Sequence, residues 1–236
     1  GLYALLMLPE TRGARPETNP ESVSRSPADW FRNPGLWVVA VLQGINRFVF
    51  AGVLAATLAL VVQDQMSTVD LAVGTNLVIG VATLTGVLMA GRTVLSMLSA
   101  PLSGAFSDRL GSRWGVTTIA MVVGALSMLL LSRSSPVSML LGVALGAVAG
   151  GGIQALVTAQ TGDLVEQHHR GRAIGMLHTA GDLGSAAGPL VAYGLLVWIG
   201  LSGVFVLCAG LFAVGAILAL WYSRRIRSRQ IDHVSS

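Results

Sequence analysis

The chain has 236 residues, of which 53% are apolar and only 11% are charged, and its formal net charge is +4. Soluble domains carry about 25% charged residues, so this composition, with a mean hydropathy of +0.71, excludes an ordinary soluble protein and predicts several membrane spans. The single cysteine, Cys208, excludes an internal disulfide and a cysteine metal cluster.

Two short segments precede the first expected span. Residues 1–8 are apolar, but a bilayer crossing takes about 20 residues, so we interpret them as the end of a preceding transmembrane helix. Residues 9–34 are rich in Pro, Glu, Arg and Ser, which predicts a cytoplasmic linker without a core of its own.

Six apolar stretches follow, and they predict an all-α bundle over residues 35–223 with a basic cytoplasmic tail at 224–236. The last two spans come from one charge-free stretch that is too long for a single helix, and we place the turn between them at residues 200–203. The expected spans are 35–62, 79–107, 114–131, 136–160, 173–199 and 203–223.

The arginines predict the orientation, because basic residues gather in the cytoplasmic loops of membrane proteins. If each span flips the side, one side receives twelve arginines: 12, 15, 25, 32, 109, 113, 170, 172, 224, 225, 227 and 229. The other side receives only Arg133, and Arg47 and Arg92 fall inside spans. We therefore expect a protein of the plasma (inner) membrane with both ends of the chain in the cytoplasm.

A short charged turn joins the second and third spans with the pattern G-x-x-x-D-R-x-G-x-R, from Gly104 to Arg113. This pattern resembles the cytoplasmic loop signature of the major facilitator superfamily. Other stretches agree with it: L-P-E-T-R-G at 8–13, Asp163 followed by R-G-R-A-I-G at 170–175, and G-x-x-x-G-P ending at Pro189. The resemblance implies that six transmembrane helices form the second half of a twelve-helix fold.

The loop signature implies a conformational latch at the cytoplasmic face. A carboxylate there can accept hydrogen bonds from free N–H groups at a helix N-terminus, and in the family the corresponding aspartate holds the two halves together. The loop glycines would permit close helix approach and a positive φ. The alternative is that the charges only mark a solvated turn. The candidates are Gly104, Asp108, Arg109, Gly111 and Arg113, with Asp163 as the expected partner of Arg113 and Arg170 as a further supporting charge.

Three glycines of the fifth span, Gly181, Gly184 and Gly188, recur at spacings of three and four and so share one helix face. Small residues let membrane helices touch, and Pro189 invites a bend because it removes a backbone hydrogen bond. Both features suit a helix that rocks against its neighbours, and static packing is the alternative.

Ionisable residues inside spans are expensive and indicate functional sites. Arg47, Arg92 and Asp182 all fall near the middle of the membrane, and Gln43 and His178 each lie one helical turn from one of them. We expect these residues to bind substrate or ion, with Asp182 able to take up a coupling proton when an arginine moves away. The alternative is a structural ion pair between Arg92 and Asp182.

No metal site, cofactor or enzymatic activity is expected. His168 and His169 are adjacent in a loop, where we expect them to point apart with no third ligand nearby. The sequence has neither a phosphate-binding glycine loop nor a nucleophile–base arrangement.

The resemblance implies a secondary active transporter that moves a small solute by alternating access, in a chain that lacks its N-terminal half. Its partners would be the lipid bilayer, the missing six-helix half, a small-molecule substrate and a coupling proton. One alternative is a half-size transporter that works as a dimer. Another is a protein of the same fold that senses or scaffolds without transport.

Overall fold

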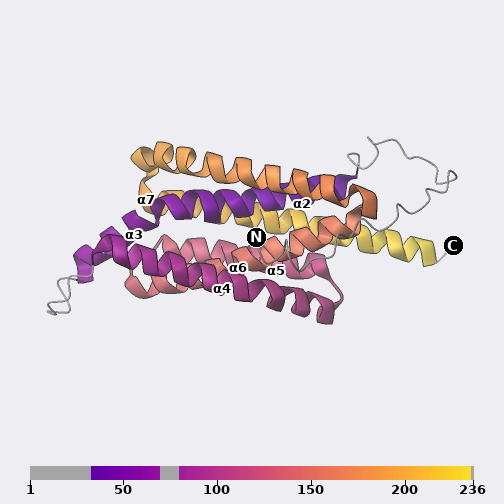
Figure 1. Ribbon diagram of the computed structural model, residues 1–236, viewed down its shortest axis with the longest axis horizontal. Helices are drawn as coiled ribbons and strands as arrows, with labels where there is room; N and C mark the ends of the chain where they lie inside the picture. The colour runs from indigo at the N-terminus through magenta and orange to yellow at the C-terminus, as the bar shows by residue number, and fades with distance from the viewer. Residues whose placement is uncertain (1–32, 70–79, 235–236) are drawn as a thin grey trace, which may run out of the picture. The chain divides into compact units, whose positions relative to one another are not determined.

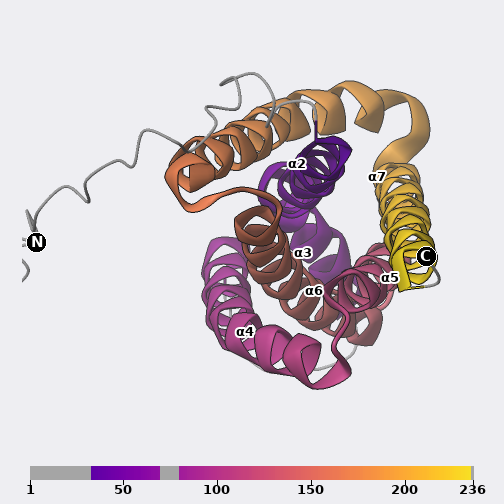
Figure 2. The ribbon, with the colours of Figure 1, turned by 90° about the vertical axis from the view of Figure 1, so that its right-hand side faces the viewer.

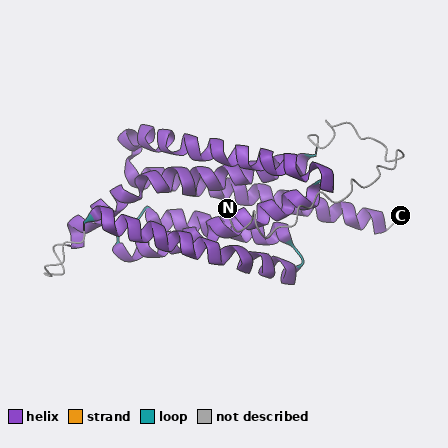
Figure 3. Ribbon diagram, viewed as in Figure 1, coloured by secondary structure: helices purple, strands orange, loops and turns teal. Residues whose placement is uncertain are grey.

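The computed structural model describes residues 33–69 and 80–234, and nearly all of them are helical (Figure 3). The elements are α2 (Pro34–Arg47), the π-helix η2 (Phe48–Leu54), α3 (Ala55–Val69), α4 (Val81–Leu110), α5 (Arg113–Leu131), α6 (Pro136–Leu164), the 3₁₀ turn η3 (Gln167–His169) and α7 (Arg170–Val234). The expectations for the first apolar segment and for the linker up to residue 32 lie outside the described residues.

Five helical stretches in the described part of the chain are long and apolar enough to cross a membrane. The first of them runs through α2, η2 and α3 without a break, and the last is α7. Six separate spans are therefore not shown, and their number stays a prediction. The last two expected spans are joined in α7, in which a single residue, Gly200, lies outside helical conformation.

Gly200 has φ 66° and ψ 176°, and it lies where the turn at 200–203 was expected. Figure 1 shows that the chain reverses its direction there, so that the orange and yellow parts of α7 run antiparallel. Only glycine adopts this backbone conformation readily.

Short polar signals set the ends of the helices. The Asn33 side chain accepts a hydrogen bond of 3.0 Å from the Gly35 N–H at the start of α2. Gly111 ends α4 with φ 60°, and the next residue, Ser112, caps α5 by accepting from the Gly115 N–H at 3.2 Å. Pro136 occupies the first position of α6, where its missing N–H has no helical partner to lose.

The core residues come mainly from α2, η2, α3, α5, α6 and the second part of α7. Figure 2 shows the bundle of these helices end-on. Phe50 of η2 and Phe212 of α7 stack with ring centroids 5.0 Å apart, and Met121 and Leu42 are fully buried beside them. In contrast, α4 buries none of the residues in its most apolar stretch of 18. It packs chiefly against α6 and leaves much of its surface uncovered.

The glycine face of α7 packs directly on the backbone of the first span. A methyl group added at Gly184 would lie 2.5 Å from the Gly44 carbonyl oxygen, and one added at Gly188 would lie 2.5 Å from the Gly52 Cα. Such short distances mean that a larger residue would push the two helices apart. These glycines therefore set the close approach of α7 to α2 and η2.

Candidate functional site

Two groups of charged or polar residues stand out in the described residues, one at a bundle end and one among the apolar spans. At the end, Arg113 joins two helices, because its Nη1 donates to the Asp163 carboxylate of α6 and its Nη2 lies 3.8 Å from Asp108 of α4. Asp163 is the partner that the sequence suggested. A pocket of about 380 Å³ lies beside these three side chains.

The remaining charged residues expected in this region, Asp108, Arg109 and Arg170, have different surroundings. The Asp108 side chain is 72% exposed and meets Arg113, while Ser112 supplies the N-cap of α5 that was considered for Asp108. Arg109 is exposed. Arg170 forms no ion pair with a described carboxylate, and its Nε donates instead to the Gly162 carbonyl at 3.2 Å, at the end of α6. The role of Arg170 as a supporting charge therefore stays a prediction.

The second group surrounds a pocket of about 250 Å³ that Arg47 and Arg92 both line. At 1.5 Å per residue, Arg47 lies about 20 Å along α2 from Pro34, and Arg92 about 16 Å along α4 from Val81. Both are therefore deep within helices that would cross a hydrocarbon core of about 30 Å. The lining residues are Asn46, Arg47, Phe50, Ala51, Arg92, Ser96, Gly146, Ala147, Gly150 and Gln154.

Arg92 is held in place by the π-helix. Its Nη2 donates to the Phe50 carbonyl at 2.8 Å, and its Cζ lies 5.6 Å from the centre of the Phe50 ring. The remaining close contact of its guanidinium is weak, since Nη1 lies 4.0 Å from the Met89 sulfur. π-helical segments inside α-helices recur at functional sites, and this one places a carbonyl and an aromatic ring beside a charged side chain.

Arg47 ends α2 at the start of the π-helix, and its buried Nε has no hydrogen-bond partner among the described residues. The amides around it are only half satisfied. Gln43 donates to the Gln154 side chain at 2.7 Å and Asn46 to the Gly150 carbonyl at 3.4 Å, but the amide oxygens of Gln43 and Asn46 are buried and meet no donor from the described part of the chain. Buried polar groups are normally hydrogen-bonded, so this wall of the pocket has unused capacity.

The structure brings Gln43, Arg47 and Arg92 together and leaves His178 and Asp182 apart from them. His178 and Asp182 are exposed on α7, and neither lines the pocket. The neighbouring residue Gly181 is the one that faces α2, since a methyl group there would lie 3.0 Å from Arg47 Cγ. Asp182 forms no ion pair within the described part of the chain. The structure therefore shows no contact between Asp182 and Arg92 that would support either a structural ion pair or proton uptake by Asp182 when Arg92 moves away.

Sequence reasoning missed the uncharged members of the site. Asn46, Gln154, Phe50 and Ser96 line the pocket, but none of them carries a charge that marks it within an apolar span. The amides were the available signal, because an amide in a membrane helix needs a partner. The π-helix that positions Phe50 has no sequence signature that we recognised.

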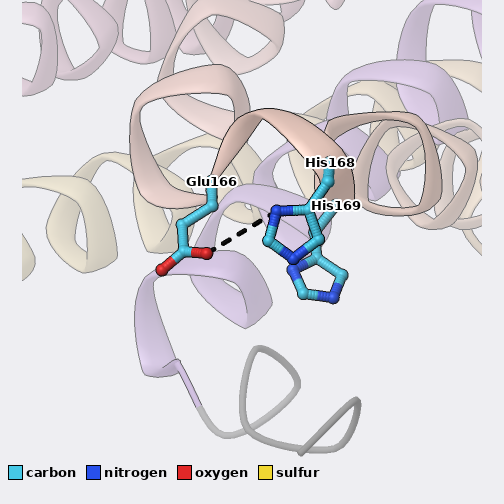
Figure 4. Close-up of side chains that lie close together, drawn as sticks. All are labelled: Glu166, His168 and His169. Atoms are coloured by element: carbon cyan, nitrogen blue, oxygen red, sulfur yellow. Dashed lines mark ion pairs between the residues drawn. The ribbon is translucent and has the colours of Figure 1, made fainter. Parts of the chain in front are cut away.

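A loose cluster of potential metal ligands lies in the turn between α6 and α7. Glu166, His168 and His169 offer ligand atoms that lie within 4.8 Å of one another (Figure 4). The expectation that the histidines point apart without a third ligand is wrong, since their rings stack with centroids 3.9 Å apart and Glu166 lies 3.7 Å from His168 Nδ1. Zinc takes such ligands at about 2.0–2.2 Å, so these side chains would have to close in to hold an ion.

Comparisons with known proteins agree with the fold and with the loop pattern. The sequence profile of the Major Facilitator Superfamily matches residues 36–233. The tetracycline resistance protein, class C, of Escherichia coli is 34% identical over 135 residues, which make up 56% of this chain and 33% of that protein. The crystal structure of an auto-inhibited POT family peptide transporter superposes with a TM-score of 0.58 at 18% identity, over 81% of this chain and 37% of that one.

The chain thus spans about a third of the length of these relatives. The likeness to the peptide transporter is one of fold. The profile match covers most of the chain, from the third residue of α2 to the last residue but one of α7. This protein therefore belongs to the Major Facilitator Superfamily, as a membrane protein of the transporter fold and not as an enzyme.

Proposed function

We propose that this bundle is the second six-helix half of a secondary active transporter that moves a small solute by alternating access. The observation that carries the proposal is the pocket of Arg47 and Arg92, deep among apolar spans in a member of a transporter superfamily. Transporters of such folds bind their substrates near the middle of the bilayer, often where a helix is broken or irregular. The π-helix beside this pocket fits that pattern.

The proposal includes six crossings, with the turn at Gly200 dividing α7 into two spans. A pocket at one end of the bundle joins residues around Gly200 with Arg133 and Asp64, so these three lie together. The charged turns at 108–113 and 163–170 and the C-terminal end of α7 lie at the other end (Figure 1). The basic bias between the two ends supports cytoplasmic chain ends in the plasma membrane.

The partner of the bundle would be a further six-helix unit, which would cover the uncovered faces of α4 and the first part of α7. We infer that Asp108 acts as a latch toward this unit, because its carboxylate is exposed while Arg113 fixes its position. The glycine contacts of α7 with α2 and η2 would let the helices shift as rigid bodies, since Gly184 and Gly188 lie against backbone atoms there. His178 and Asp182 would face the second unit, where a carboxylate can serve a coupling proton.

Flux measurements on the full-length protein in proteoliposomes test this function. The relatives suggest tetracycline and a dipeptide as first solutes, and a panel of small organic ions extends them. We expect saturable flux of at least one solute, lost in the Arg92→Gln variant at normal expression. Saturable binding without flux of any solute would contradict transport and favour a sensor or scaffold of the same fold.

Full activity of residues 1–236 alone would contradict the need for a second unit, and cross-linked pairs of active copies would favour the dimeric alternative.

A further inference from the structure

The pocket of Arg47 and Arg92 carries two positive charges and no negative one. None of its lining residues is acidic. The ion pairs within the described part of the chain lie at the bundle end, between Arg113 and its two aspartates and between His168 and Glu166. Asp182 follows Gly181, the glycine that packs on Arg47, but its own side chain is exposed and does not line the pocket.

Two unpaired guanidinium groups are costly at this depth. A charge inside a membrane span is tolerated when it meets a partner or a water-filled cavity, and a buried charge without a counter-charge is destabilising. Arg92 uses one N–H on a neutral carbonyl, and Arg47 leaves its buried Nε unpaired. Arginine offers five N–H donors in a planar fork that fits a carboxylate or phosphate. The remaining N–H groups of Arg47 and Arg92 can therefore bind an anion.

The walls of the pocket tell what kind of anion would fit. Phe50, Ala51 and Ala147 give the pocket apolar walls, and the Phe50 ring itself is packed against Gly146 and Gly150, where an added methyl group would come within 3.0 Å of it. The amide of Gln154 and the hydroxyl of Ser96 add neutral hydrogen-bonding groups. An anionic lipid headgroup is a poor fit, because Arg92 lies about 16 Å and about 27 Å along α4 from its two ends. A small soluble organic anion meets both the charge and the apolar surface.

We propose that this pocket binds the carboxylate or phosphate group of a small organic anion between Arg47 and Arg92, and that this anion is the transported solute. The claim that the anion is transported rests on the proposed function. The claim that the pocket binds an anion rests on the geometry of the pocket alone. Phe50 then serves two purposes, because its carbonyl accepts a hydrogen bond from the Arg92 guanidinium and its buried ring lies 5.6 Å from the Arg92 Cζ, so that both hold the guanidinium at the pocket.

Benzoate and benzamide test the charge requirement, since they share one shape and differ in charge. Their binding to the full-length protein is measured by calorimetry in nanodiscs of phosphatidylcholine, which contain no competing anionic lipid. We expect benzoate to bind at least tenfold more tightly than benzamide. Arg47→Gln and Arg92→Gln should each weaken benzoate binding at least tenfold and leave benzamide binding unchanged. Arg133→Gln, at an exposed position among the residues around Gly200, is the matched control and should change neither.

Equal affinity for the two compounds, or no saturable binding of benzoate, would overturn the anion site. If Arg92→Gln does not fold, Arg92→Lys is measured instead, because it keeps the positive charge. This variant should still bind benzoate more tightly than benzamide. Equal affinity of Arg92→Lys for the two compounds would count against the proposal. The two proposals fail separately. Benzoate binding without flux of any solute would refute transport alone, and flux of a neutral solute with no preference for benzoate would refute the anion site alone.

Discussion

At the scale of single residues, Arg113 connects the ends of α4 and α6 through two carboxylates. Its ion pair with Asp163 is the shorter contact, and the one with Asp108 spans 3.8 Å. Exposed pairs of this kind contribute about 1 kcal/mol or less to stability. Their value to a transporter would lie in favouring one conformation over another, because a shift of population needs only a few kcal/mol of differential interaction.

Replacing Asp108 by asparagine tests the latch. Asp108→Asn keeps the size of the side chain and removes its charge, so we expect unchanged insertion and a melting temperature within a few degrees of wild type, with a transport rate reduced severalfold in the full-length protein. Transport is measured in proteoliposomes and folding by thermal unfolding in detergent. Glu166→Gln is the control, because it removes another exposed carboxylate from the same end of the bundle outside the contacts of Arg113. A wild-type transport rate in Asp108→Asn would show that Asp108 is only a solvated turn residue and not a latch.

The sequence reveals the charged residues of the candidate site better than their surroundings. Arg47 and Arg92 are visible because a charge in an apolar span stands out, and the structure places both at one pocket. Asp182 shares that visibility but is exposed on α7, because the helix presents the neighbouring Gly181 to α2. Which face a helix buries depends on its tertiary packing, and an apolar span carries little polar pattern to reveal it.

At the scale of helices, glycine contacts decide how α7 meets the first span. Gly184 is the sharpest case, since a methyl group there would lie 2.5 Å from a backbone oxygen and 3.1 Å from the Phe48 nitrogen. Backbone atoms of a neighbouring helix cannot move aside as a flexible side chain can. The spacing of three and four in the sequence indicated a small-residue face, and the structure identifies α2 and η2 as what it meets.

We therefore expect Gly184→Ala to destabilise the bundle by about 1–3 kcal/mol, the usual cost of overpacking. Gly194→Ala is the matched control in the same helix, because nothing lies within 4 Å of a methyl group there. That variant should be neutral or more stable, since alanine favours a helix by about 1 kcal/mol over glycine. Unfolding in detergent measures both. Equal stability of the two variants would show that α7 does not approach α2 this closely.

Gly200 determines the path of the chain in the second half of α7. Its backbone conformation strains any other residue by about 1–3 kcal/mol, so we expect Gly200→Ala to lower the melting temperature of the protein. Gly210→Ala, at an exposed helical position with open space around it, should not lower it. If α7 were one continuous helix, both alanines would raise stability alike, and that result in unfolding experiments would remove the turn at Gly200.

A positive φ was expected of the loop glycines and is found at Gly111, because this signal is local in the sequence, but the cap of α5 comes from Ser112 and not from Asp108. The π-helix at 48–54 could not be predicted, since its surroundings are distant in the sequence: η2 packs against α7, and its Phe50 carbonyl accepts from the Arg92 side chain. The division of α7 was placed in the right stretch from a charge-free run too long for one span. The near-continuous helical conformation on both sides of Gly200 was not expected.

At the scale of the whole molecule, a well-packed core and an uncovered side coexist in one bundle. Phe50, Phe212 and Met121 pack the interior, while α4 leaves its most apolar stretch unburied. The pocket of the two arginines lies between α4 and the core helices. This arrangement fits a bundle that moves against a second unit of the same kind, with the solute held between them.

Alternating access of this pocket is the central claim, and one accessibility measurement tests it without knowing the solute. Ser96 lines the pocket and is half-buried, so Ser96→Cys places a single thiol there once Cys208 and any cysteine outside residues 1–236 are replaced by alanine. The full-length protein is treated with a membrane-impermeant thiol reagent in right-side-out and in inside-out vesicles. Ser134→Cys, at the exposed turn between α5 and α6, is the control and should react from one side only. We predict that the thiol at position 96 reacts from both sides, and reaction from a single side, or from neither, would contradict the account.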